Sequence, residues 1–179
     1  MPALDLPAAD TGKPPILLIA KPQLQDPNFA GAVVLVVFPG GTPVGVILNR
    51  PLKLTAKEAF ADDPRLQRRG DTLYLGGPVQ PTQLMFLFQQ AQAPDRAFFV
   101  MEDLYLSGDG GVLEQLLSGS GEPVQRFFLG YSGWTSSQLE REIDLGAWYV
   151  LPADRQTVLR KDTDTLWRDL MLRATAVKA

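Results

Sequence analysis

Short runs of apolar residues recur along the chain and predict strands, because several are rich in β-branched side chains and end at glycine or proline. These runs cover residues 16–20, 32–38, 44–48, 73–75, 84–88, 97–101, 104–106, 124–129 and 147–151. The runs at 32–38 and 44–48 lack a polar alternation, so both faces of each strand are expected to be buried. The intervening Pro39-Gly40-Gly41-Thr42 predicts a short hairpin loop.

Helices are indicated where apolar residues repeat at helical spacing. Residues 112–117 show this spacing, and in residues 163–174 it places Leu166, Trp167, Leu170 and Met171 on one face. Thr55 and Glu58 form a capping box that predicts a short helix ending near residues 62–64.

A further helix is predicted to begin near residues 135–137, where two capping boxes overlap. Thr135 with Gln138 and Ser137 with Glu140 both fit the motif, so the first residue of the helix is uncertain by two positions. Consecutive strands joined by short loops require antiparallel neighbours, so we expect an α+β fold and not a doubly wound parallel sheet. Residues 15–179 are predicted to form a single domain, and the proline-rich residues 1–14 a mobile tail.

The most restrictive feature of the composition is that the 179 residues include no histidine and no cysteine. This excludes a Ser-His-Asp triad, cysteine nucleophiles, disulfides and thiolate or imidazole metal sites. Any acid–base chemistry would need Asp, Glu, Lys or Tyr with a strongly shifted pKa. We expect no cofactor and no metal, and keep a hydrolase or transferase that uses Asp, Glu or Lys as an alternative.

The charge pattern bears on nucleic acids and membranes. The formal net charge is −3, which argues against broad phosphate binding, although Arg65, Arg68, Arg69, Arg155 and Arg160 form two basic clusters beside acidic residues. A regulator that contacts DNA through these arginines is kept as a second alternative. The N-terminus lacks a secretory pattern and the longest apolar run is far short of the roughly 20 residues that cross a bilayer, so a cytoplasmic protein without a membrane partner is expected.

The segment Gly130-Tyr131-Ser132-Gly133-Trp134 superficially resembles the G-x-S-x-G elbow of serine hydrolases. The second glycine comes one position early, tryptophan stands in its place, and the chain has no histidine base. We therefore interpret the segment as a scaffold, with Gly130 ending a strand and Ser132 inert.

Seven residues are candidates for ligand contact. Asn49 follows a buried strand, Gly76 and Gly77 can bring backbone close to a ligand, and an aromatic group with an amide suits small-molecule or peptide recognition. That group consists of Tyr131, Trp134, Gln138 and Trp148. For Asn49 and the two glycines, turn formation is the competing interpretation, and for the tryptophans it is core packing.

The stretch GYSGWTSSQLEREIDLGAWYVLPAD resembles the signature of the YqgE/AlgH family of bacterial proteins. LLIAKPQLQDPNF, GVILNRPL and LYLGGPVQP are similar to further family segments in the same order, and LYLSGDGGVLEQLL is a looser match. The resemblance spans most of residues 16–152. It is weakest around residues 37–42, where the hairpin is short and lacks the family's polar residues.

The resemblance implies an α+β fold with a barrel-like, largely antiparallel or mixed sheet surrounded by helices. The family has no established molecular function; some members carry the label of transcriptional regulator, and alanine replaces Ser132 in many. We therefore expect a non-catalytic binding or regulatory module whose partner is a protein or a small molecule.

Overall fold

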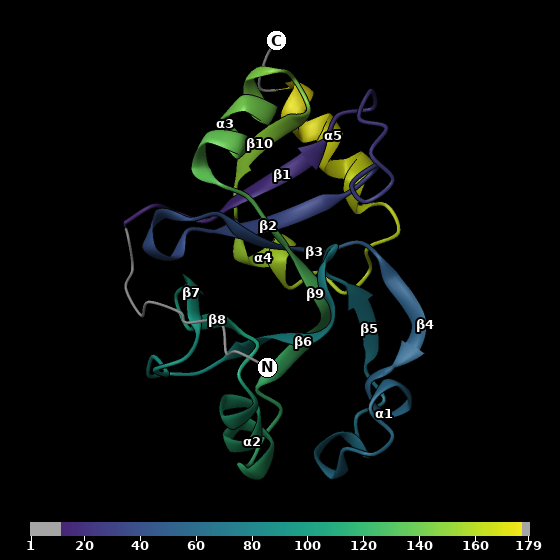
Figure 1. The fold of residues 1–179 in the computed structure, drawn as a ribbon, viewed down its shortest axis with the longest axis vertical. Coiled ribbons are helices and arrows are strands. Elements are labelled where there is room, and N and C mark those ends of the chain that lie inside the picture. Colours follow the sequence, from purple (N-terminus) through teal and green to yellow (C-terminus); the bar gives the residue numbers. More distant parts are fainter. Residues whose placement is uncertain (1–11, 177–179) are drawn as a thin grey trace.

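The structure is a computed structural model, and residues 12–176 are described. Within this range one curled sheet runs through the molecule (Figure 1), in the order β10-β1-β2-β3-β9-β6-β8-β7, with β4 and β5 attached beside β9. Its strands are β1 Ile16–Ala20, β2 Val33–Val37, β3 Val44–Ile47, β4 Pro51–Thr55, β5 Thr72–Leu75, β6 Val79–Gln89, β7 Phe98–Met101, β8 Leu104–Ser107, β9 Val124–Gly133 and β10 Trp148–Pro152.

The strand pairings are antiparallel except for the pair of β5 with β9, which is parallel. The long strand β9 pairs with β3 at one end and with β6 along most of its length, so it joins the two halves of the sheet. The sheet curls into a half-barrel, which confirms the expected α+β, barrel-like and largely antiparallel architecture. Of the predicted tail at residues 1–14, residues 1–11 lie outside the described part of the chain.

The helices are short and pack at separate places on the sheet. Leu139 of α3 packs on one face of the β1–β2–β3 half, Leu170 of α5 packs on the other face, and Leu113 of α2 packs against β6 and β8. That helices surround the sheet stays a prediction. The helices of the described chain are α1 Ala56–Ala59, α2 Gly110–Ser118, α3 Ser136–Asp144, α4 Arg155–Val158 and α5 Leu166–Ala176, with 3₁₀ turns at Pro39–Gly41 and Pro64–Leu66.

Capping side chains fix the starts of α3 and α2. The Thr135 hydroxyl accepts the backbone N–H of Gln138 at 3.1 Å, so α3 begins at Ser136 and the first of the two overlapping boxes is the one used. The Asp109 carboxylate accepts the N–H of Val112 at 3.0 Å and caps α2. This contact lowers the pKa of Asp109, because the hydrogen bond favours the charged carboxylate.

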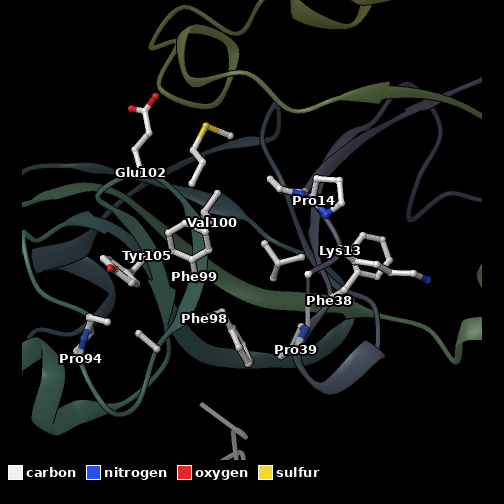
Figure 2. Close-up of a pocket in the computed structure, with 16 residues that line it drawn as sticks. Lys13, Pro14, Phe38, Pro39, Pro94, Phe98, Phe99, Val100, Glu102 and Tyr105 are labelled. Carbon is white, nitrogen blue, oxygen red and sulfur yellow. The ribbon is translucent and has the colours of Figure 1, made fainter. Parts of the chain in front are cut away.

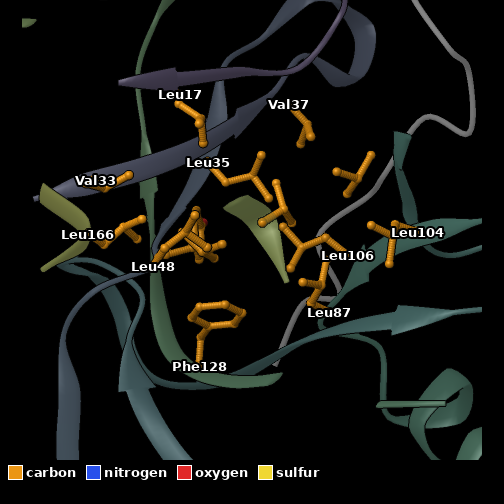
Figure 3. Close-up of a cluster of buried hydrophobic side chains, with 14 of the residues drawn as sticks. Leu17, Val33, Leu35, Val37, Leu48, Leu87, Leu104, Leu106, Phe128 and Leu166 are labelled. Carbon is orange, nitrogen blue, oxygen red and sulfur yellow. The ribbon is translucent and has the colours of Figure 1, made fainter. Parts of the chain in front are cut away.

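Both faces of β2 are buried, as its unbroken apolar sequence predicts. One set of alternate side chains, including Leu35, enters the cluster that fills the half-barrel together with Leu87, Leu106 and Phe128 (Figure 3). The other set, including Val34, packs beneath α3. β2 therefore separates two apolar layers, one inside the half-barrel and one outside it.

The largest departures from the sequence-based elements are in β6 and β9. β6 begins at Val79, five residues before the predicted run, and β9 continues to Gly133, so the prediction that Gly130 ends a strand is wrong. Gly130 adopts φ +69°, a conformation that lets the strand bend without ending. Two further elements, β4 and α4, are short and only partly buried, and no local pattern predicted them.

Candidate functional site

Gly76 and Gly77, predicted as ligand-contact candidates, lie where the chain after β5 crosses β9. A Cβ atom on Gly76 would lie 2.2 Å from the carbonyl oxygen of Gly130, and one on Gly77 would lie 2.3 Å from the carbonyl of Tyr131. The Gly76 N–H donates to the carbonyl of Leu129 at 2.7 Å. The absence of side chains here allows two backbone segments to touch.

Ser132 lies at the same crossing and is completely buried. Its hydroxyl donates to the carbonyl of Gly76 at 3.1 Å, and the same carbonyl accepts the N–H of Ile47 at 2.9 Å. A nucleophile must reach its substrate and a base, and this hydroxyl reaches only backbone. Its geometry agrees with the interpretation of the segment as a scaffold.

Replacing Ser132 with alanine should lower the free energy of unfolding by about 1 kcal/mol, because one hydrogen bond is lost while Ile47 keeps the Gly76 carbonyl paired. Urea unfolding measures the change. We also expect a fluorophosphonate probe to label neither the wild type nor the variant. Covalent labelling that disappears in S132A would contradict the scaffold role.

Trp134 and Trp148 are 5% and 2% exposed, and both indole N–H groups donate to the same Glu142 oxygen at 3.0 Å. Phe29 stacks against Trp134 and meets Trp148 edge to face. Gln138 is exposed and donates to the second Glu142 oxygen at 3.3 Å. The structure thus brings these predicted residues together around a carboxylate that sequence reasoning did not single out.

Tyr131 belongs to the cluster inside the half-barrel and not to the tryptophan group, because it lies in β9 with its ring directed inward. Burial raises the pKa of its phenol. The side-chain amide of Asn49 is also hydrogen-bonded within the fold. Its oxygen accepts the N–H of Val33 and its nitrogen donates to the carbonyl of Gly31, both at 2.9 Å. Ligand contact by the seven residues stays a prediction.

The arginines considered for DNA contact are largely engaged with carboxylates. The pairs join Arg65 to Asp63 at 2.7 Å, Arg69 to Asp71 at 2.8 Å, Arg155 to Asp103 at 2.6 Å and Arg160 to Asp169 at 2.9 Å. The first two arginines lie around the Pro64–Leu66 turn and the other two at α4, in different parts of the fold (Figure 1). Paired guanidinium groups have less capacity to neutralise phosphates, so this arrangement does not favour the DNA alternative.

A groove of about 600 Å³ opens beside β7, and this size is typical of ligand sites. One wall is formed by β7 and the loop before it, and the other by residues 12–15 and the end of β2 (Figure 2). The apolar side chains that define it are Val37, Phe38, Pro39, Phe98, Phe99, Val100 and Met101.

Among the described residues that line the groove, Lys13, Glu102 and Tyr105 carry the charged or hydroxyl groups. Figure 2 shows Lys13 and Glu102 at different ends. The Lys13 ammonium lies 5.1 Å from the centre of the Phe38 ring, and Glu102 pairs with Arg155 at 3.1 Å. One carboxylate and one distant ammonium do not form an acid–base pair, so the groove gives no support to the enzymatic alternative.

Phe99 is the most informative residue of the groove, because its aromatic ring is 44% exposed in a strand whose neighbours are buried. Residues 97–101 were predicted only as an apolar strand, and none of the seven predicted contact residues lines this groove. Composition alone carries no signal for the exposure of one phenylalanine.

Two features are absent from the described residues. Residues 12–176 contain no group of three or more acidic residues arranged to hold a metal ion. The same range includes no helix with the length and apolarity that a membrane span requires.

Several known bacterial proteins are similar to this chain in sequence and in fold. A UPF0301 protein of Chlorobium phaeobacteroides is 34% identical over 154 residues, 84% of this chain and 81% of the relative. The solution structure of the AlgH protein from Pseudomonas aeruginosa matches with a TM-score of 0.69 and 29% identity, covering 92% of this chain and 88% of that one.

A crystal structure of a Corynebacterium diphtheriae protein shares the fold with a TM-score of 0.69 at 24% identity, over 89% and 86% of the two chains. The profile of the family described as AlgH-like matches residues 17–177. Because this match covers most of the chain, the protein belongs to the AlgH-like family.

Proposed function

We propose that this protein is a non-catalytic binding module, acting in the cytoplasm, that holds an apolar ligand in the groove beside β7. The observation that carries the proposal is the exposed Phe99 ring inside a concave, largely apolar surface. Exposed aromatic side chains in a hollow are typical anchors for ligands and partner proteins.

We prefer the groove to the tryptophan group as the ligand site because the contacts of the two tryptophans are already made within the fold. Trp134 and Trp148 already have their indole N–H groups bound to Glu142 and their rings packed against Phe29. A ligand there would have to displace these contacts, whereas a ligand in the groove covers Phe99 without breaking a described hydrogen bond.

The proposal is tested by titrating the protein with Nile red, a neutral apolar dye, and following its fluorescence. Phe99→Asp should weaken binding about tenfold or more, because it removes an aromatic anchor and places a charge in the groove. Val150→Asp is the matched control, since Val150 is 41% exposed on β10 and does not line the groove.

The control should change Nile red affinity less than about twofold, as expected for a site outside the contact surface. Equal losses in the two variants would show that the dye binds elsewhere and would remove the support for the groove. Circular dichroism spectra of both variants establish that the fold is intact.

A further inference from the structure

Every residue of β7, from Phe98 to Met101, lines the groove, and Glu102 continues the row. Successive side chains of a strand point to opposite faces, so a pocket against one face of β7 would contact only alternate residues. Contact with consecutive residues places the groove along the edge of the strand, where the backbone N–H and C=O groups lie.

This edge of β7 is the end of the sheet. β7 follows β8 as the last strand in the order; its ladder pairs Phe98 with Leu106 and Met101 with Leu104, with one register shift between Phe99 and Met101. Within residues 12–176, no backbone hydrogen bond from outside this ladder reaches Phe98–Met101. An open strand edge is a template for one more strand, with backbone hydrogen bonds giving affinity and side-chain pockets giving specificity.

The opposite wall limits what can enter. Phe38 and Pro39 face β7 across the groove, and the same wall contains Pro14 and Pro15 (Figure 2). Proline has no backbone N–H to donate, so this wall offers an incoming chain mainly apolar contact. Because this wall stands across the groove from β7, an incoming chain has to lie between the two, which suits a single extended segment better than the sheet edge of a second folded copy.

The charges at the two ends of the groove differ in how they are compensated. Glu102 lies at the far end and shares Arg155 with Asp103, so its carboxylate already has a cationic partner within the chain. Lys13 lies against the Phe38 ring, and no carboxylate among the described residues is within ion-pair distance of its ammonium. An acidic residue of the incoming segment would complement Lys13.

We propose that the groove takes an extended segment of another protein, apolar at alternate positions and carrying an acidic residue at the Lys13 end, which pairs with β7 as an added strand. This inference rests on the proposed binding function and names the class of partner. The four residues of β7 match a segment of about four paired residues, because paired strands advance together by about 3.3 Å per residue.

The test uses the full chain and a fluorescein-labelled peptide, Glu-Val-Thr-Val-Thr-Val, followed by fluorescence anisotropy. Two companion peptides carry N-methyl groups on one or the other set of alternate amides. Because only one set faces β7, methylating that set should weaken binding about tenfold or more, and methylating the other set less than about twofold. Lys13→Glu should weaken binding of the parent peptide about fivefold and strengthen binding of a peptide that begins with lysine.

The outcomes separate this inference from the binding function itself. If Nile red binds in the groove but the peptide fails to bind, or binds equally well with either set of amides methylated, strand addition is wrong and the binding module stands. If Nile red binding does not depend on Phe99, both proposals fall.

Other occupants of the groove give their own results. A synthetic peptide with the sequence of residues 1–11 that displaces the labelled peptide at lower concentration than the unlabelled parent would assign the groove to this chain's own segment. A dimer in sedimentation that the peptide dissociates would assign the groove to a second copy. Either result would overturn the proposal of a foreign strand.

Discussion

Replacing Gly76 with alanine should lower the free energy of unfolding by about 3 kcal/mol, the upper end of what overpacking costs. The added Cβ would lie 2.2 Å from the carbonyl oxygen of Gly130, and this oxygen belongs to a strand backbone that cannot rotate away as a side chain can. For a chain of this length, such a loss corresponds to a fall of about 6–12 °C in the melting temperature. Urea unfolding followed by tryptophan fluorescence measures it.

Gly70→Ala is the matched control for this substitution. Gly70 is exposed, and a Cβ there would meet no atom within 4 Å, so its unfolding free energy should change by no more than about 0.5 kcal/mol. Similar losses in both variants would contradict the account based on backbone contact, because an alanine that acts only through the unfolded chain should raise the unfolding free energy.

Replacing Glu142 with alanine should lower the free energy of unfolding by about 3 kcal/mol, because two buried indole N–H groups lose their acceptor together. Glu142→Gln should lose only about 1 kcal/mol, since a side-chain oxygen can still accept at the same place while the charge is lost. Chemical denaturation of the two variants, with the near-ultraviolet dichroism of the tryptophans as a second signal, measures these changes.

Glu140→Ala tests whether the loss comes from the indole contacts or from α3 itself. Glu140 lies on the exposed side of the same helix, so its removal should change the unfolding free energy by about 0.5 kcal/mol or less. If Glu140→Ala destabilises the protein as much as Glu142→Ala, the carboxylate that joins Trp134 and Trp148 is not a major contributor to stability.

These two predictions concern the segments that carry the family resemblance. Gly76 and Gly130 lie in two of them and meet at the backbone crossing, while Trp134 and Trp148 lie in the same segment as Gly130 and join through Glu142. The groove-lining strand β7 lies between the resembling segments and not within them. The residues that carry the family resemblance therefore stabilise the architecture, whereas the proposed binding site lies outside them and is tested by separate experiments.

Much of the fold follows from local sequence features. The unbroken apolar run of β2 predicted the burial of both its faces, and the two overlapping capping boxes predicted the start of α3 to within two residues, because periodicity and capping depend on residues a few positions apart. The extension of β9 through Gly130 was not predictable in this way. A glycine can end a strand or bend it, and which occurs here depends on the close approach of the distant residues Gly76 and Gly77.

By itself, then, the sequence determined the classes of element, the sheet-dominated α+β fold, the buried strands and the exclusion of histidine and cysteine chemistry. Three features depend on the tertiary structure. Glu142 accepts hydrogen bonds from both indoles, and the buried Ser132 hydroxyl donates to a backbone carbonyl. Phe99 is exposed beside an open strand edge. The physical reason is separation along the chain: the groove exists because residues 12–15, the end of β2 and β7 come together when the sheet curls, and no local pattern encodes that meeting.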